Sequence, residues 1–189
     1  MGNEPYSAPW FFFDQDGTLN QWRWIDISVV ATPGYFRTVI PHENVICAAR
    51  MLSEYYPVGT YGAVWQDGHS QSDKDWWMDT HAAFISQNRR FYVPCGTEKA
   101  SYFERLIGRP ITKADILIDD NSQVLRSWES HGGTGIKVRT PQNGRHGTWR
   151  GASFSCDAPA EAIAEYLLMI RNGKNRTINI YFNSKLNMI

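Results

Sequence analysis

Short apolar runs alternate with longer amphipathic stretches along most of this chain. Residues 10–13 form the first run, and residues 58–64 form the second, although glycines are unusual inside a strand. The remaining runs are 90–93, which Pro94 would end, 115–118 and 135–138. Strand-length runs separated by helix-length segments are typical of an α/β domain with a parallel sheet. We therefore expect these runs to be parallel strands.

Helical periodicity fills most of the segments between the runs. Three of the expected helices cover residues 42–56, 98–108 and 158–170. Two more are defined by their ends: one is capped by Ser72, and the other begins at Asn121 and stops at residues 132–133. Residues 21–41 show no clean period and are interpreted as an irregular insertion, and residues 139–154 as a loop. Residues 177–182 predict either an edge strand or a loose tail.

The composition fits one folded domain. The chain has 189 residues, of which 42% are hydrophobic, enough to build a sizeable core. We expect a domain over residues 1–172, with a small cap inserted at about residues 20–41, and a separate tail over 173–189.

Charge and cysteine content narrow the class of function. Nineteen Lys and Arg balance nineteen Asp and Glu, which argues against a protein that binds nucleic-acid polymers. The apolar runs are too short to cross a membrane, and the chain does not open like a secretory signal. The three cysteines, Cys47, Cys95 and Cys156, are widely spaced, as reduced thiols of a cytoplasmic protein would be.

Acidic residues follow two of the expected strands, at the point where each strand ends. Asp14 and Asp16 follow the first strand, and Asp119 and Asp120 end the fourth. In open α/β sheets, ligands bind outside the carboxyl ends of the strands. Carboxylates gathered there repel one another unless a cation offsets them, and oxygen-only ligands suit Mg²⁺. One carboxylate can then attack phosphorus, and an acid two residues later can protonate a leaving alkoxide.

The same segments resemble a known superfamily. Residues 11–19 (FFFDQDGTL) match the first motif of the haloacid dehalogenase (HAD) superfamily, and residues 116–120 (ILIDD) match its fourth. Within it, the chain is similar to the 5′(3′)-deoxyribonucleotidase family. The segments that carry this narrower likeness are 33–37 (PGYFR), 64–69 (VWQDGH), 91–99 (FYVPCGTEK) and 143–149 (NGRHGTW).

The resemblance implies a HAD-type Rossmann-like fold of three layers with a small insertion cap, and a Mg²⁺-dependent phosphomonoesterase. It makes Asp14 the nucleophile and a metal ligand, and Asp16 the general acid and base, whose backbone carbonyl also faces the metal. It makes Asp119 a metal ligand and Asp120 a ligand through water or an orienting neighbour. Lys99 would be the cation that pairs with Asp14 and phosphate.

The second motif of the superfamily is incomplete in this chain. It normally places Ser or Thr at the end of the second strand, but Gly62 stands there. Thr60 faces the same side but is set back by about 6.6 Å. The backbone N–H groups of Gly62 and Ala63 remain as phosphate donors, and the lost hydrogen bond predicts roughly 10- to 150-fold weaker activity. A binding protein with impaired catalysis is the alternative.

Aromatic residues of the insertion are candidates for contacts with the rest of the substrate. Trp22, Trp24, Tyr35 or Phe36 could form a flat wall for a nucleobase, or could simply pack the insertion onto the domain. Arg37 could meet phosphate or lie on the surface. The expected partner is therefore a small-molecule (deoxy)nucleoside monophosphate or another, non-nucleotide phosphomonoester, with self-association into a homodimer left open.

Overall fold

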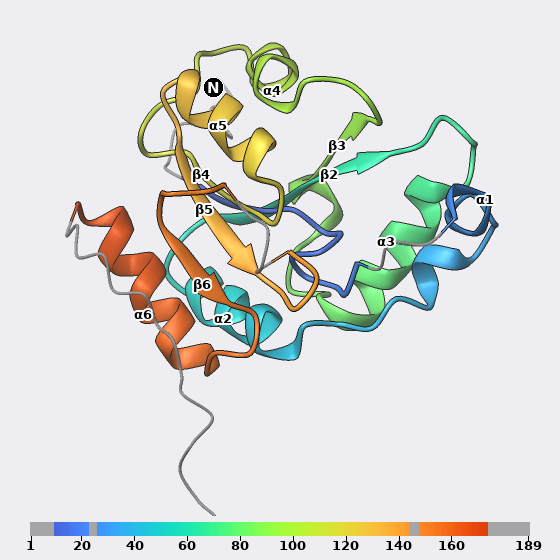
Figure 1. Ribbon diagram of the computed structural model, residues 1–189, viewed down its shortest axis with the longest axis horizontal. Helices are drawn as coiled ribbons and strands as arrows, with labels where there is room; N and C mark the ends of the chain where they lie inside the picture. Colours follow the sequence, from blue (N-terminus) through green and yellow to red (C-terminus); the bar gives the residue numbers. More distant parts are fainter. Residues whose placement is uncertain (1–9, 23–25, 144–147, 174–189) are drawn as a thin grey trace, which may run out of the picture.

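The computed structural model describes residues 10–22, 26–143 and 148–173. Its centre is a single sheet of parallel strands in the order β3-β2-β1-β4-β5-β6 (Figure 1). The strands are β1 (Phe11–Phe13), β2 (Val58–Val64), β3 (Arg90–Pro94), β4 (Ile116–Asp119), β5 (Thr134–Arg139) and β6 (Ser153–Ser155). The α/β fold with a parallel sheet is confirmed.

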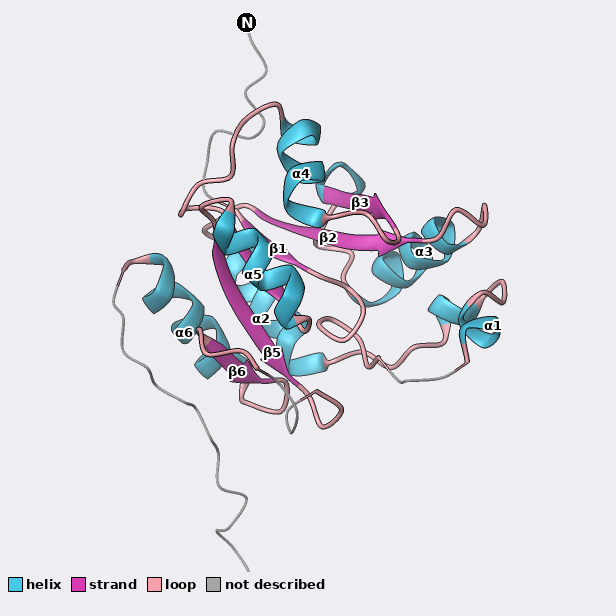
Figure 2. Ribbon diagram, turned by 45° about the horizontal axis from the view of Figure 1, so that its top comes forward, coloured by secondary structure: helices cyan, strands magenta, loops and turns pink. Residues whose placement is uncertain are grey.

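Helices cover both faces of the sheet and make a three-layer, Rossmann-like domain (Figure 2). The helices are α1 (Ile27–Val30), α2 (Glu43–Ser53), α3 (Ser70–His81), α4 (Lys99–Ile107), α5 (Ser122–Ser130) and α6 (Ala160–Arg171). Buried residues of α2, α3 and α6 belong to one core cluster, and those of α4 and α5 to the other. No helix in the described part of the chain is long and apolar enough to cross a membrane.

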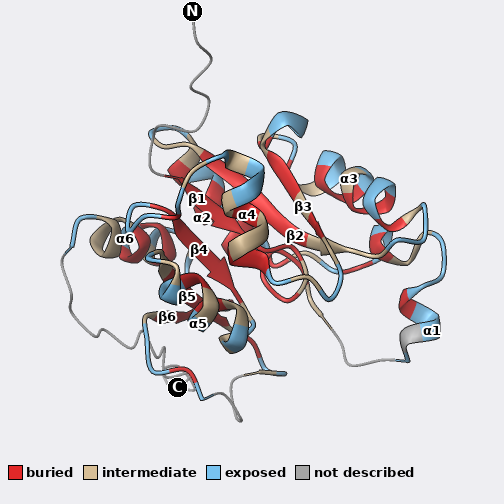
Figure 3. Cartoon of the chain, turned by 90° about the horizontal axis from the view of Figure 1, so that it is seen from above, coloured by how far each residue is buried: buried red, intermediate tan, exposed pale blue. Residues whose placement is uncertain are grey.

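The consecutive phenylalanines of β1 show how this sequence makes a central strand. Side chains alternate between the two faces of a strand. Phe11 and Phe13 therefore pack into the core with α2 and α6, while Phe12 packs into the core with α4 and α5. All three are almost completely buried, and in Figure 3 the sheet is buried between helices that expose their outer sides. An all-apolar run is what a strand buried on both faces requires.

The strand order places the candidate site. After β1 the chain builds β2 and β3 on one side, and then crosses over to build β4 on the other side of β1. This reversal between β1 and β4 is a topological switch point, where ligands bind in open α/β sheets. Phe13 and Ile118 are paired in the register, so the next residues, Asp14 and Asp119, emerge side by side.

Three expected boundaries are corrected by the structure. The helix α3 begins at Ser70 rather than at Ser72, because the Asp67 carboxylate accepts the N–H groups of His69 and Ser70 and so caps the first turn. Pro94 is the last residue of β3 rather than the residue after it. The end of the expected loop 139–154 is not a loop, because residues 153–155 form the short edge strand β6 beside β5.

The expected cap at Asn121 is present, and Glu98 provides a second cap that was not expected. Asn121 accepts the N–H groups of Gln123 and Val124 at the start of α5. Glu98 accepts those of Ala100 and Ser101 at the start of α4. The tail segment 177–182 lies outside the described residues.

The insertion after the first motif is small and is fastened to α3. It contains α1 and a 3-10 turn at Tyr35–Arg37. The buried Asp73 carboxylate accepts hydrogen bonds from the Gly34 N–H and the Arg37 Nε. The Trp77 indole N–H donates to the Val39 carbonyl. These contacts hold the insertion beside the carboxyl ends of β1 and β2.

Candidate active site

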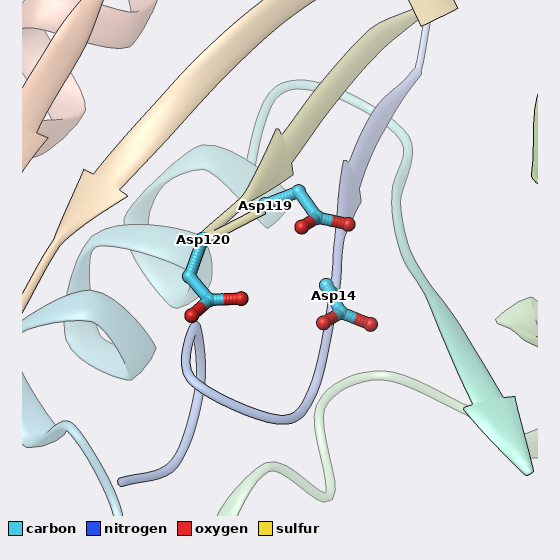
Figure 4. A group of neighbouring side chains, drawn as sticks. All are labelled: Asp14, Asp119 and Asp120. Atoms are coloured by element: carbon cyan, nitrogen blue, oxygen red, sulfur yellow. The ribbon is translucent and has the colours of Figure 1, made fainter. Parts of the chain in front are cut away.

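Three carboxylates from two distant segments converge at the switch point. Asp14 follows β1, Asp119 ends β4 and Asp120 follows it, and all three point toward one another (Figure 4). One oxygen from each lies within 4.8 Å of the others. A Mg²⁺ ion with bonds of about 2.1 Å separates opposite ligands by about 4.2 Å, so small side-chain adjustments would bring all three to one ion. These are the hard oxygen donors that such an ion prefers, and they fit a magnesium site.

Gly17 makes room for this cluster. Its φ of +75° lies in the left-handed region, and a Cβ there would lie 2.5 Å from both Cγ and Oδ2 of Asp120. A contact that short is a severe clash. The glycine of the first motif therefore allows the turn after β1 and leaves space for a carboxylate from β4.

Lys99 supplies a positive charge inside the cluster. It is the first residue of α4, and its Nζ lies 2.9 Å from Asp14 Oδ1 and 2.8 Å from Asp119 Oδ2. The side chain is largely buried, and Nζ also donates to the Tyr61 carbonyl at 3.2 Å. Burial lowers the pKa of Lys99, but the carboxylates of Asp119 and Asp14 outweigh it and raise that pKa above its usual value. Lys99 is therefore a permanent cation beside Asp14.

One lysine does not neutralise the cluster. Burial, followed by repulsion from Asp119 and Asp16, raises the pKa of Asp14 to about 7 despite the attraction of Lys99. Burial and the charges of Asp119 and Asp14 raise the pKa of Asp120 to about 8. Without a metal, the negative charges are costly to hold together. A bound divalent cation would offset this excess of negative charge.

Asp16 faces the same pocket, but its carboxylate is not one of the converging three. Its Oδ2 accepts a hydrogen bond from the Lys74 ammonium at 2.5 Å, and its Oδ1 accepts one from the Asn20 side-chain amide at 3.3 Å. Its side chain is 22% exposed. Asp16 is therefore accessible from the pocket and held at both oxygens.

The end of β2 lies beside Asp14, as the sequence predicts. A Cβ on Gly62 would lie 3.6 Å from Asp14 Oδ1, an ordinary van der Waals distance. Thr60 is paired with Phe13 in the register, so it lies further back in the sheet. Its buried hydroxyl finds no hydrogen-bond partner among the described residues. Thr60 therefore does not take the place of the missing hydroxyl at position 62.

A pocket of about 670 Å³ opens from the carboxylates. Asp14, Asp16, Lys99, Asp119 and Asp120 line one part of it. The rest of its lining includes Trp22, Ala63, Trp65, Arg126, Lys137 and Asn143. The volume is large enough for a nucleotide-sized ligand.

The residues predicted to bind the substrate lie in different places. Gly62 is beside Asp14 at the end of β2 but is not among the residues that line the pocket. Trp22 and Ala63 line the pocket. Trp24 lies outside the described residues. Phe36 and Arg37 correct the prediction, because neither of them lines the pocket: Phe36 is fully buried, and Arg37 binds Asp73 and stacks over Trp76. The irregular pattern of the insertion gave no means of telling a pocket wall from a packing residue.

Three residues near the carboxylates were missed. Lys74 of α3 contacts Asp16, Trp65 lines the pocket after β2, and the Asn143 side-chain amide contacts Asp120 Oδ2 at 3.4 Å. Only Lys74 had a usable signal. It precedes the buried Trp77 by one helical turn, so it falls on the buried face of its helix.

Solved structures share this fold at low sequence identity. No protein-family model matches the chain, and no curated protein matches it significantly. The D,D-heptose 1,7-bisphosphate phosphatase of B. bronchiseptica, complexed with magnesium and phosphate, is 18% identical with a TM-score of 0.58, over 86% of this chain and 99% of that one. A haloacid dehalogenase-like hydrolase from Xanthomonas campestris is 9% identical with a TM-score of 0.61, over 88% and 97%.

A third solved structure also shares this fold. A HAD family hydrolase from Deinococcus radiodurans R1, with bound phosphate and sodium, is 11% identical with a TM-score of 0.56, over 85% of this chain and 97% of that one. These identities establish likeness of fold. The chain has the α/β Rossmann-like fold of HAD-type hydrolases.

Proposed function

We propose that this chain is a Mg²⁺-dependent phosphomonoesterase that hydrolyses (deoxy)nucleoside monophosphates through an aspartyl-phosphate on Asp14. One observation carries the proposal: the carboxylates of Asp14, Asp119 and Asp120 converge around a space that one ion could fill, with Lys99 bound to two of them. Structures with the same fold include a phosphatase complexed with magnesium and phosphate, which supports this reading.

The reaction uses Asp14 first. When bound, Mg²⁺ would be held by Asp14, Asp119, Asp120 and the backbone carbonyl of Asp16, and would offset negative charge on phosphate and carboxylate. An oxygen of Asp14 bonds to phosphorus as the bond from phosphorus to the ester oxygen breaks. Asp16 gives its proton to that departing oxygen, which leaves as the alcohol of the nucleoside.

The second half returns the enzyme to its starting state. Asp16, now a carboxylate, takes a proton from water as the water oxygen attacks phosphorus and the bond to Asp14 breaks. Inorganic phosphate leaves, and Asp16 is protonated again. Lys99 keeps Asp14 oriented and balances the charge of the phosphoryl oxygens, to which the N–H groups of Gly62 and Ala63 are also expected to donate.

The nucleotide preference rests on the walls of the pocket. Trp22 and Trp65 both line the cavity that holds Asp14. Base–aromatic stacking contributes about 1–3 kcal/mol per base, so these rings favour a substrate with a flat apolar group. We also propose a cytoplasmic location, which the free thiols of Cys47, Cys95 and Cys156 support.

A non-nucleotide phosphate is the second candidate substrate, because a structure with this fold is a sugar phosphatase by name. The test measures phosphate release from deoxynucleoside 5′- and 3′-monophosphates and from sugar phosphates, with Mg²⁺ and with EDTA. We expect Mg²⁺-dependent release that favours nucleotides and is abolished by Asp14→Asn. Equal or better turnover of sugar phosphates would overturn the nucleotide preference.

Absence of activity in the parent would favour the impaired nucleotide-binding alternative that Gly62 suggests. Activity that survives Asp14→Asn would contradict the proposed chemistry.

A further inference from the structure

Lys74 is a buried lysine whose ammonium reaches Asp16. Its side chain is 1% exposed, and Nζ lies 2.5 Å from Asp16 Oδ2 and 2.6 Å from the carbonyl oxygen of Ala63. Nζ also lies 4.5 Å from the centroid of the Phe36 ring. One ammonium therefore joins the loop after β1, the end of β2 and the insertion.

A buried ammonium is an unfavourable choice for a position that only needs to be packed. Taking an ammonium out of water is strongly unfavourable unless partners compensate. Met78, on the same buried face of α3, fills its position with apolar surface alone. Packing alone would be served by an apolar residue at position 74, whereas the ammonium adds an ion pair with Asp16 to its contacts with the Ala63 carbonyl and the Phe36 ring.

The contacts of Lys74 restrict the orientation of the Asp16 carboxyl group. Lys74 holds one oxygen, and the Asn20 side-chain amide holds the other at the longer distance of 3.3 Å. Lys74 itself cannot swing away freely, because the Ala63 carbonyl and the Phe36 ring surround its head. The phenyl ring of Phe36 thus serves the site by packing on Lys74 rather than by touching a substrate.

We propose that Lys74 is a positioning residue that holds the Asp16 carboxyl group where it can reach both the departing ester oxygen and the attacking water. The proposal rests on the proposed function. It assigns Lys74 no contact with the substrate: the proton moves between Asp16 and the departing oxygen or water, and Lys74 only fixes the group that carries it.

Two substrates with different leaving groups can show whether Lys74 positions Asp16 or only stabilises the fold. A nucleoside leaves as a poor, strongly basic alkoxide and needs the proton of Asp16 as the P–O bond breaks. 4-Nitrophenol leaves as a stable phenolate and does not need it. Attack of water on the aspartyl-phosphate needs Asp16 with either substrate. Misplacing Asp16 should therefore slow nucleoside release and phosphoenzyme hydrolysis, and should spare the first release of nitrophenol.

The experiment is rapid-quench and stopped-flow kinetics on the full chain with Mg²⁺, using a deoxynucleoside monophosphate and 4-nitrophenyl phosphate. For Lys74→Met we expect nucleoside release to fall about 10- to 100-fold, part of the 10²- to 10⁴-fold effect of general acid–base catalysis. We expect the nitrophenol burst rate to stay within about twofold of the parent while its steady-state rate falls. Asp16→Asn should show the same pattern more strongly.

Lys113→Met is the control, since Lys113 is exposed in the loop before β4, and both rates should remain those of the parent. If Lys74→Met does not fold, Lys74→Arg, which keeps the charge with a different reach, should show the same selectivity with a smaller loss. Equal slowing of both first-release rates, or no slowing of nucleoside release, would overturn the role of Lys74. An inactive parent would instead overturn the proposed function, and this role with it.

Discussion

The backbone of Gly17 lies so close to Asp120 that a Cβ at position 17 would sit 2.5 Å from the carboxyl carbon. The turn after β1 and the acid after β4 therefore fit together only with glycine. Gly17→Ala must displace Asp120 and must also adopt a φ of +75°, which costs an L residue about 1–2 kcal/mol by itself.

Gly108→Ala is the matched control, because Gly108 has a φ of +70° with nothing within 4 Å of its Cβ position. Measured by urea unfolding, Gly17→Ala should lose more free energy of unfolding than Gly108→Ala, and only Gly17→Ala should lose phosphatase activity. Equal losses of stability with full activity would contradict the close fit of Gly17 to Asp120.

Restoring the second-motif hydroxyl is expected to raise activity. A Cβ at position 62 meets Asp14 Oδ1 at 3.6 Å, so a serine there is accommodated without displacing its neighbours. A hydrogen bond to a charged group contributes about 1.5–3 kcal/mol, which converts to roughly 10- to 150-fold in rate. Gly62→Ser should raise kcat/KM in this range. Gly62→Ala adds the same Cβ without the hydroxyl and should give no gain; a gain in both variants would exclude the hydrogen bond as the cause.

Asp120 should make the metal-free protein less stable at neutral and higher pH. Burial raises the pKa of its carboxyl from 3.8 to about 8 in the folded state, so between these values the unfolded state has lost a proton that the folded state keeps. Unfolding is therefore increasingly favoured as the pH rises through this window, and the loss of stability is complete above about 8.

With EDTA, Asp120→Asn should raise the melting temperature at pH 8 by at least about 2–4 °C, the shift that 1 kcal/mol produces in a chain of this size, and should leave it unchanged at pH 3.5. With saturating Mg²⁺ the advantage at pH 8 should shrink or reverse. An advantage that is independent of pH would show that charge is not the cause.

Trp22 and Arg37 should respond differently to truncation. Trp22 lines the pocket, whereas Arg37 binds Asp73 beside α3. Loss of about 1–3 kcal/mol of stacking predicts that Trp22→Ala raises KM for a deoxynucleotide roughly 5- to 150-fold. Arg37→Ala should leave KM within about twofold and lower the melting temperature instead. A large rise in KM for Arg37→Ala would restore the earlier expectation that Arg37 contacts the substrate.

The parts of the fold with strong local patterns were predictable. The phenylalanines of β1 and the apolar run of β4 marked buried strands, and the acids directly after them marked the carboxyl edge where ligands bind. Lys99 was expected from the resemblance, and its position at the start of a helix after β3 agrees with that expectation. Each of these depends on residues close together in the chain.

The rest depends on packing between distant segments. The sequence left Phe36 as either a pocket wall or a packing residue, because nothing local reveals that Lys74 of α3 covers its ring. The strand β6 is three residues long, too short for an alternating pattern to be recognised. The start of α3 was hard to predict because both Asp67 and Ser72 have side chains that can cap a helix, and the structure uses Asp67. The position of Lys74 one turn before Trp77 predicts a buried face, but its contacts with Asp16 and Ala63 depend on how α3 packs against the ends of β1 and β2.

The proposed chemistry requires the carboxylates of Asp14, Asp119 and Asp120 to share one divalent ion next to the phosphoryl group. A crystal structure of the chain with Mg²⁺ and fluoroberyllate measures this. We expect beryllium bonded to an Asp14 oxygen, with one Mg²⁺ about 2.1 Å from the other Asp14 oxygen, from Asp119 and from the Asp16 carbonyl oxygen, and with Asp120 bound directly or through water. Fluoroberyllate bound away from Asp14, or a magnesium ion that touches neither Asp14 nor Asp119, would contradict it.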